Sequence, residues 1–216
     1  MTSLDEYISR CNEEQKAIYY ITGDDIAVLR NNPQLEAFKQ KGIEVLLMNE
    51  PIDEFWPQVL PNYKGYTIKH ISQADVDMTW KREEQRADDG SLTKLCEFMA
   101  ETLKNEVGKV TFTEKLTTSP VSLTVEGGQM SLHLERLMRN HQQQTAFAST
   151  RILELNPYHP LIIKLSDMIM NDENKAKVEE VTKVLLDQSK VAEGEPISDP
   201  SFYAEKVSNY ILNSLN

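Results

Sequence analysis

Residues 17–21 read AIYYI and residues 43–48 read IEVLLM, and these two short apolar runs decide how the first part of the chain folds. Each run is rich in β-branched or aromatic residues, which is typical of a strand buried on both faces. A third strand is expected at residues 66–71. Helical patterns lie between and around these runs, at residues 3–14, 26–30, 34–41 and 52–60. Strands that alternate with helices predict a small parallel sheet with helices on its faces, an α/β/α module.

A polar segment separates this module from the rest of the chain. Charged side chains dominate residues 72–90, and Gly90 closes the run. We therefore expect a first domain over residues 1–80, a linker over residues 81–90 and a second domain over residues 91–216.

The second domain has a different pattern, in which strands and helices do not alternate regularly. Strands are expected at residues 110–113, 121–125 and 151–155, and helices at residues 91–105, 130–141 and 161–170. A long helix then runs to Glu193, and Asp199 and Pro200 open a final helix. This order predicts a short antiparallel sheet with helices, ending in a dimerising helix pair. The fold class expected for the whole chain is α/β followed by α+β.

Composition limits the possible partners. The chain has 216 residues, with 23 Lys and Arg against 34 Asp and Glu, so its formal net charge is -11. Such a charge repels phosphate, so neither nucleic acid nor an anionic membrane is an expected partner. Cys11 and Cys96 are far apart in sequence, which excludes a disulfide framework and favours a reducing compartment. With no long apolar run and no signal peptide, the expected location is cytoplasmic.

No motif in the chain predicts catalysis. The turn at residues 22–25 follows a strand, as a phosphate loop does, but it is acidic and has one glycine. None of the four histidines lies in a zinc-binding motif, and His133 and His141 are expected to be exposed. Asp53 and Glu54 are adjacent in a helical pattern, so a solvated pair is expected rather than an acid–base pair. The sequence therefore predicts no catalytic residue and no metal site.

The helix expected at residues 130–141 has an apolar face. Met130, Leu134, Leu137 and Met138 are spaced so that they share one side of the helix. Methionine is adaptable and suits surfaces that bind varied partners. The spacing fits two alternatives, in which this face either binds a partner or packs on the sheet of its own module.

The last two helices have apolar stripes that continue almost to the chain end. The stripe residues are Val181, Val184 and Leu185 on the long helix, and Tyr203, Val207, Tyr210, Ile211 and Leu215 on the final one. Two helices are too few for a bundle, whereas pairing with a second copy gives a four-helix bundle with two-fold symmetry. The alternative is that the stripes dock on the chain's own sheet.

Residues 52–56 read IDEFW and place two aromatic residues side by side. A helix cannot bury both Phe55 and Trp56 on one face, so one of them is a candidate contact point. The sequence leaves open which of the two is exposed.

Several stretches closely resemble one family. Residues 17–23 (AIYYITG), 41–48 (KGIEVLLM) and 52–54 (IDE) resemble the end of the middle domain of the heat-shock protein 90 chaperones. Residues 151–160 (RILELNPYHP) are similar to the signature of the C-terminal domain of that family. The motifs occur in the family's order and spacing, and the resemblance covers essentially the whole chain. The absence of an acidic tail after Asn216 resembles the bacterial type.

The resemblance implies a homodimeric, ATP-dependent chaperone of the stress response that binds partly folded client proteins. Its ATP and Mg would bind in an N-terminal domain, with a catalytic arginine from an earlier part of the middle domain. Neither region is in this chain, so no cofactor and no enzyme activity are expected here, and Met1 is expected to begin an excised piece.

The resemblance also implies client contacts at two places. One is an acidic–aromatic site that matches Glu54 and Phe55, next to Trp56. At the position of Phe55 the family usually has tryptophan. The other is the apolar helix face that begins at Met130 and includes Leu134.

The expected function is therefore a chaperone fragment that supplies homodimerisation and client-contact surfaces. The alternative is a small α/β ligand-binding or enzyme domain with a helical dimerisation tail. A nucleotide-binding assay separates the two, because the chaperone fragment is expected not to bind ATP.

Overall fold

The computed structural model describes residues 2–12, 15–73, 90–126, 129–140 and 149–215. Contacts between Cα atoms divide the chain into two compact units, which are described separately here. Unit 1 comprises Met1–Trp80, Glu114–Thr117 and Val125–Ser149, and unit 2 comprises the remaining residues. The linker expected over residues 81–90 lies outside the described residues except for Gly90. The domain boundaries drawn from the sequence stay a prediction.

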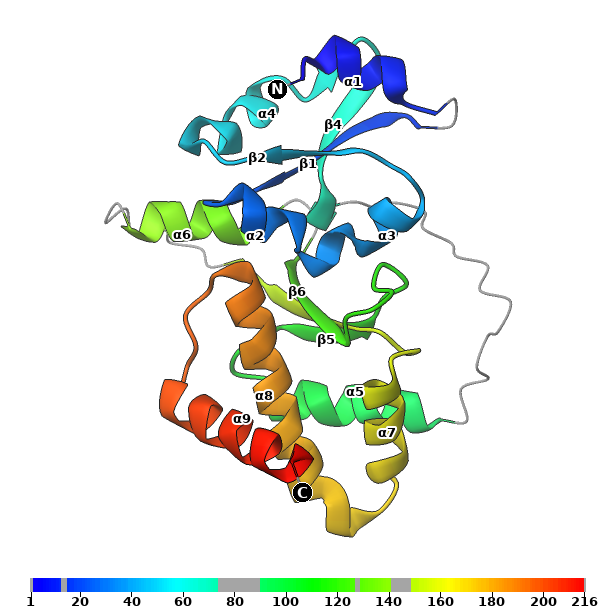
Figure 1. Ribbon diagram of the computed structural model, residues 1–216, viewed down its shortest axis with the longest axis vertical. Coiled ribbons are helices and arrows are strands. Elements are labelled where there is room, and N and C mark those ends of the chain that lie inside the picture. Colours follow the sequence, from blue (N-terminus) through cyan, green and yellow to red (C-terminus); the bar gives the residue numbers. More distant parts are fainter. Residues whose placement is uncertain (1, 13–14, 74–89, 127–128, 141–148, 216) are drawn as a thin grey trace. The chain divides into compact units, whose positions relative to one another are not determined.

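Unit 1 is built on a four-stranded sheet in the order β2-β1-β4-β3 (Figure 1). The central strand β1 (Ala17–Thr22) pairs in parallel with β2 (Val45–Met48) and with β4 (Tyr66–His70). This confirms the expected parallel sheet. The sequence pattern missed the edge strand β3 (Asn62–Tyr63), which pairs antiparallel with β4 through a turn at Lys64 and Gly65. Both turn residues have positive φ, as tight hairpin turns require.

Helices cover both faces of this sheet. The bounds are α1 (Leu4–Arg10), α2 (Ile26–Arg30), η1 (Pro33–Leu35), α3 (Glu36–Gln40), η2 (Pro51–Glu54), α4 (Trp56–Val59), η3 (Ile71–Gln73) and α6 (Leu132–Asn140). On one face, Ile21 packs with Leu29 and Phe38; on the other, Ile18 packs with Tyr7. The strand is therefore buried on both sides, as its unbroken apolar run predicts.

Two of the expected helices are broken. The helix expected over residues 52–60 consists of η2 and α4, which meet at Phe55. The helix expected over residues 34–41 begins with the 3₁₀ turn η1. Proline explains the first break, because Pro57 follows it directly and cannot donate the hydrogen bond that a continuing helix needs. Pro33 and Pro51 only begin their segments, at positions where a helix tolerates proline.

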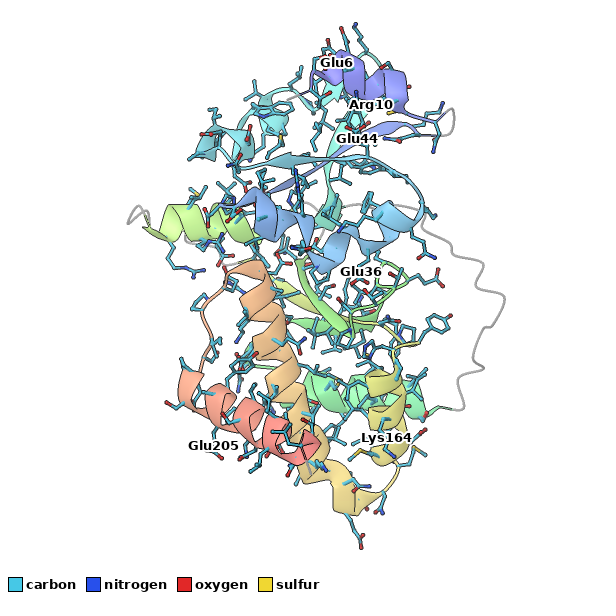
Figure 2. The ribbon with its side chains drawn as sticks, viewed as in Figure 1. Glu6, Arg10, Glu36, Glu44, Lys164 and Glu205 are labelled. Atoms are coloured by element: carbon cyan, nitrogen blue, oxygen red, sulfur yellow. The ribbon has the colours of Figure 1, made fainter. Side chains whose placement is uncertain are left out.

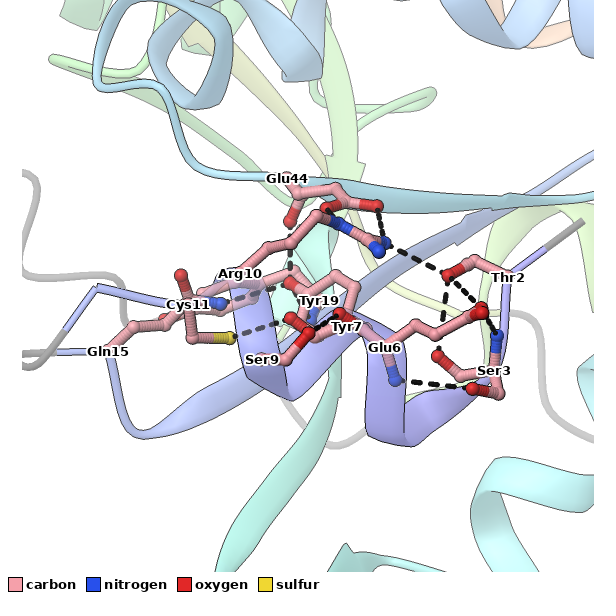
Figure 3. Close-up of polar contacts among 10 residues, drawn as sticks. All are labelled: Thr2, Ser3, Glu6, Tyr7, Ser9, Arg10, Cys11, Gln15, Tyr19 and Glu44. Atoms are coloured by element: carbon pink, nitrogen blue, oxygen red, sulfur yellow. Dashed lines mark hydrogen bonds and ion pairs between the residues drawn. The ribbon is translucent and has the colours of Figure 1, made fainter.

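Tyr7 fixes α1 on the sheet (Figure 3). Its hydroxyl donates to the Glu44 carbonyl at 2.5 Å and accepts from the Tyr19 amide at 3.1 Å and from Gln15 Nε2 at 3.0 Å. Burial raises the pKa of Tyr7 to about 12. Arg10 makes two 2.7 Å hydrogen bonds to the Glu44 carboxylate, and Figures 2 and 3 show these two side chains turned toward each other.

Unit 2 contains a three-stranded sheet in the order β5-β7-β6. The strands are β5 (Lys109–Phe112), β6 (Val121–Val125) and β7 (Arg151–Leu155). The expectation of an antiparallel sheet is wrong for β5 and β7, which pair in parallel with Val110 opposite Leu153. Strands β5 and β6 are consecutive in the chain but not neighbours in the sheet, so no hairpin forces them to be antiparallel. The sheet is mixed.

The helices of unit 2 are α5 (Ser91–Thr102), α7 (Pro160–Met168), η4 (Asp172–Asn174), α8 (Lys175–Glu193) and α9 (Pro200–Ser214). Figure 1 shows α9, drawn in red, alongside α8, drawn in orange. Asp199 caps α9 as expected, accepting a hydrogen bond from the Phe202 amide at 2.9 Å. Gly194 ends α8 in the left-handed conformation, with φ +69.

Candidate functional site

Helix α6 carries the predicted client-contact face, and the structure groups it with unit 1 rather than with the second module. Ser131 stands just before the helix, and its hydroxyl accepts a hydrogen bond from the Leu134 amide at 3.0 Å. The same hydroxyl donates to Glu54 Oε2 at 3.0 Å. One side chain therefore starts α6 and ties it to η2.

His133, in the first turn of α6, makes the main polar contact between this helix and the rest of unit 1. Its Nδ1 lies 2.6 Å from Glu54 Oε1, and its Nε2 lies 3.1 Å from Asp24 Oδ1. Arg136, one turn further on, donates to Asp24 Oδ2 at 2.7 Å. With a carboxylate at each ring nitrogen, the imidazole can donate two hydrogen bonds when it is protonated. We call this cluster the α6 anchor; it consists of Asp24, Glu54, Ser131, His133 and Arg136.

The α6 anchor corrects two expectations. His133 is only 9% exposed, not solvated, and Glu54 is only 4% exposed, not half of a solvated acidic pair. His141 lies outside the described residues. The burial of His133 could not be found from spacing, because its partners lie far away in sequence.

The charges of the anchor support one another. Burial opposes a charge on His133, but the hydrogen bonds to Glu54 and Asp24 outweigh burial and raise the pKa of His133. Burial also acts to raise the pKa of Glu54, and the hydrogen bond and charge of His133 are among the contacts that outweigh it and lower this pKa. The hydrogen bond from His133 and the nearby Arg136 lower the pKa of Asp24. The arrangement therefore favours a protonated imidazole between two carboxylates.

The apolar face of α6 is partly covered. Leu134 is buried, while Leu137 and Met138 are half-buried. Met130 is half-buried too, but the expectation that it belongs to this helix is wrong, because α6 begins at Leu132. Leu132, which the sequence analysis did not select, is buried as well. The face therefore packs within the chain, and three of its four predicted contact residues keep some exposed surface.

A cavity of about 430 Å³ lies beside the start of α6. It brings together Glu54 and the predicted contact residues Met130 and Leu134. The other lining residues are Tyr20, Pro57, Gln58, Pro61, Ile68, His70, Gln129 and Ser131, all from unit 1. Neither Phe55 nor Trp56 lines this cavity.

The structure separates the two adjacent aromatic residues of this segment. Phe55 is 47% exposed, whereas Trp56 is half-buried against the core cluster of Tyr7 and Ile18. The indole nitrogen of Trp56 donates to Asp53 Oδ1 at 3.1 Å. Phe55 is therefore the exposed contact candidate, and large apolar residues near it are exposed too: Ile52, Val59 and Leu60.

The predicted dimerisation residues divide between two environments. On α8, Val184 and Leu185 are buried within the chain, and Val181 is half-buried. On α9, no residue is buried: Tyr203, Val207 and Tyr210 are half-buried, and Ile211 and Leu215 are exposed. Leu212, which the sequence analysis did not select, is also exposed. Apart from Val191 on α8, which is exposed too, the large exposed apolar residues of this helix pair therefore lie at the end of α9.

Polar contacts hold α9 against α8. Glu180 on α8 accepts a hydrogen bond from the Tyr210 hydroxyl at 2.9 Å and an ion pair from Lys206 at 2.7 Å. Burial and the hydrogen bond to Glu180 raise the pKa of Tyr210 to about 12. These contacts explain why Tyr210, although on the apolar stripe, is not free for a partner.

A polar cluster around the buried Lys190 fixes the corner between α8 and α9. Lys190 bonds to Glu106 and, at 2.8 Å, to the Ser198 hydroxyl, which also donates to Glu106 at 2.7 Å. Arg151 pairs with the buried Glu195 at 2.9 Å. The sequence analysis missed this cluster, because its members look like ordinary surface charges until the fold brings them together.

Among the described residues, no group of three or more His, Cys, Asp or Glu side chains is arranged to hold a metal ion. The same residues include no helix that is long and apolar enough to span a membrane.

Comparison with known proteins identifies consistent relatives. The chain matches the family described as Hsp90 protein over residues 1–216. It is 38% identical over 223 residues to the chaperone protein HtpG of Paramagnetospirillum magneticum (strain ATCC 700264 / AMB-1), covering 100% of this chain and 36% of that protein. It is 35% identical over 229 residues to the chaperone protein HtpG of Orientia tsutsugamushi (strain Boryong), covering 99% of this chain and 36% of that protein. The chain spans about a third of the length of these curated relatives.

Proposed function

The chain belongs to the Hsp90 family, and from that premise we propose that it is the dimerising and client-binding part of a bacterial chaperone. The observation that carries the proposal is the family match along the whole chain, together with relatives that are all named chaperone protein HtpG. The match supports the interpretation of residues 1–80 as the end of a middle domain and of residues 91–216 as a C-terminal dimerisation domain.

The proposed dimer forms through α9 with a second copy of the chain. A helix of 15 residues without a buried side chain is incompletely packed within one chain. Leu215 is 78% exposed and is joined on the same end of the helix by Ile211 and Leu212. A two-fold axis near these residues would let each copy cover the other's apolar surface. Val184 and Leu185 are already buried within the chain, so they would stabilise α8 rather than contact the second copy.

The proposed client surface lies on unit 1. Phe55 is exposed beside Ile52, Val59 and Leu60. Leu137 and Met138 on α6, and Met130 just before that helix, keep some exposed surface. Non-native polypeptides expose apolar side chains, and each square ångström that they bury against such a surface contributes about 25 cal/mol before ordering costs. The buried Glu54 would act on clients indirectly, by holding α6 in place.

We place nucleotide chemistry outside this chain. The family resemblance assigns ATP and Mg to an N-terminal domain, and the turn at residues 22–25 presents acidic side chains rather than a phosphate cradle. The chain by itself is therefore proposed to bind clients without hydrolysing ATP. We also propose a cytoplasmic location, since Cys11 and Cys96 are free thiols.

Paired variants test the two surfaces separately. The first variant is Ile211→Glu with Leu215→Glu on α9, and the second is Phe55→Glu with Val59→Glu on unit 1, so each replaces two exposed apolar residues by charge. Light scattering should give twice the 24.8 kDa chain mass for the parent and for the unit 1 variant, and the single-chain mass for the α9 variant. Binding of a fluorescent, permanently unfolded polypeptide should weaken only in the unit 1 variant.

Three results would contradict the proposal. A parent chain that is monomeric at tens of micromolar would remove the dimerisation role. Unfolded-polypeptide binding that is equal in all three proteins would remove the assigned client surface. Stoichiometric ATP binding by the chain would favour a small α/β ligand-binding domain instead.

A further inference from the structure

Helix α9 lies alongside α8 without burying a single side chain (Figure 1). Apolar packing therefore constrains its direction only weakly, and polar contacts have to do so at both of its ends. Toward the C-terminal end, Lys206 and Tyr210 bind Glu180 on α8, which fixes one point of the helix. A second fixed point, at the N-terminal end, is needed to define the direction in which α9 runs.

Lys190 on α8 connects the segments that meet at this second point. Its ammonium group bonds to Glu106, in the turn after α5, and donates to the Ser198 hydroxyl at 2.8 Å. Ser198 directly precedes the residue that caps α9, and its hydroxyl donates to Glu106 at 2.7 Å. Asp187, one turn before Lys190, lies 3.6 Å from the ammonium and accepts a hydrogen bond from the Ser198 backbone. We call these four residues the corner cluster.

The burial of Lys190 indicates that the corner cluster does more than stabilise the fold. Lys190 is only 6% exposed and Asp187 only 5%. Lysine is rarely buried, because removing its ammonium from water costs free energy that its partners must offset. An apolar side chain of similar length would fill the same space without that cost. What the ammonium adds is geometry, because it holds acceptors from three segments in fixed directions around one atom.

The direction of α9 matters because of the residues at its far end. Ile211, Leu212 and Leu215 are exposed there, and with a rise of 1.5 Å per residue they lie about 20–25 Å along the helix from Ser198. A tilt of about 10° at the corner would move them by about 4 Å. In a dimer with two-fold symmetry the same displacement occurs in both copies, so the two apolar ends would no longer cover each other.

We propose that Lys190 is a positioning residue for the dimer interface. By holding Ser198 against Glu106 and Asp187, it directs α9 so that the apolar end of this helix meets the same end in a second copy of the chain. The inference rests on the proposed dimerisation through α9 and deepens it. It predicts that a change at the corner cluster, far along the helix from the apolar end, weakens the dimer while unit 2 stays folded.

The first test removes the ammonium group from the whole chain. Lys190→Met keeps the aliphatic part of the side chain, and Asp187→Asn with Lys190→Met also avoids leaving a buried carboxylate without its cation. Both variants should raise the Kd of the dimer about tenfold in sedimentation velocity, with an unchanged circular dichroism spectrum. Lys164→Met makes the same change at an exposed position of α7, outside the corner cluster, and should leave the Kd as it is in the parent.

The second test asks whether Lys190 acts through Ser198. Ser198→Ala removes one hydroxyl at an exposed position and leaves the cap residue Asp199 in place. It should raise the Kd about threefold in the parent chain. In the Lys190→Met chain it should have no further effect, because the contact that it removes is already lost. Two changes that merely reduced the stability of unit 2 would instead add.

The outcomes separate this inference from the proposed function. It is supported if both Lys190 variants weaken the dimer, Lys164→Met does not, and the effect of Ser198→Ala disappears in the Lys190→Met chain. It is overturned if the parent is dimeric and the double variant dimerises with the parent's Kd, if Lys164→Met weakens the dimer equally, or if the effects of Lys190→Met and Ser198→Ala add. Dimerisation by the parent then still stands. If the parent is monomeric at tens of micromolar, the proposed dimerisation and this inference both fail.

Discussion

At the scale of single residues, the two buried histidines of unit 1 respond to pH in opposite directions. His133 has a folded-state pKa above the ordinary value of 6.5, so the stability it contributes is full below about pH 6.5 and is lost as pH rises through its folded pKa. His70 has a folded-state pKa of about 4, below the ordinary value of 6.5. Between pH 6.5 and pH 4 only the unfolded chain binds this proton, so the free energy of unfolding falls as pH falls through that range. Above pH 5 the carboxylate of Glu54 stays charged and does not contribute to this difference.

Single substitutions should separate these two effects. Between pH 7.5 and pH 5, the His70 titration lowers the free energy of unfolding by about 2 kcal/mol, so His70→Gln should remove about that much of the loss seen in the parent. His133→Gln should cost more stability at pH 5 than at pH 9. Urea unfolding followed by circular dichroism measures both. Equal pH profiles for His70→Gln and the parent would show that His70 is not buried in the neutral form.

Gly108 is a second residue whose identity the structure explains. A Cβ atom at this position would lie 2.3 Å from Thr150 Cγ2, and the Gly108 amide is fixed by its 2.9 Å bond to the Arg151 carbonyl. Gly108→Ala should therefore destabilise unit 2 by about 1–3 kcal/mol. Thr150→Ser removes the methyl group in question, so the double variant should recover most of that loss. A double-mutant cycle in urea gives the coupling, and simple additivity of the two changes would contradict this explanation.

At the scale of elements, the α6 anchor determines whether the helix stays on unit 1. Glu54→Ala leaves His133 and Ser131 without their shared partner, and breaking a buried pair costs about 3 kcal/mol. Hydrogen exchange of the α6 amides should therefore speed up about 100-fold, while exchange in β1 stays unchanged. Glu97→Ala, at an exposed position of α5, removes the same charge and should change neither. If Glu54→Ala alters α6 and β1 equally, Glu54 supports the whole unit and is no specific anchor of the helix.

The same scale shows what could be learned from the sequence. The parallel strands of unit 1 were predictable because an uninterrupted run such as residues 17–21 fits a strand buried on both faces. The cap at Asp199 was predictable because capping depends on neighbours in sequence. The parallel direction of β5 relative to β7 could not be predicted. Alternation of polar and apolar residues indicates a buried face but carries no information on strand direction.

The polar parts of the site were harder to predict than the apolar ones. The spacing from Met130 to Met138 identified a helix with an apolar face, which the structure contains from Leu132 onward, with Met130 lying before its start. Its attachment depends on His133 meeting Glu54 and Asp24, and pairs so distant in sequence leave no local pattern. The apolar stripes of α8 and α9 were visible in the sequence, but the burial of the stripe residue Leu185 depends on packing within unit 2, which spacing does not reveal.

At the scale of the whole molecule, net charge should control the proposed dimer. Each chain carries -11, so two copies repel each other at long range, whereas the exposed side chains proposed for the interface, Ile211, Leu212 and Leu215, are apolar. Salt screens the repulsion, because the Debye length falls from about 30 Å at 0.01 M to about 8 Å at 0.15 M. Raising the salt should therefore tighten the dimer by about tenfold, as measured by sedimentation velocity. If salt instead weakens the dimer, opposite charges hold the two copies together, and the interface lies elsewhere than on the apolar end of α9.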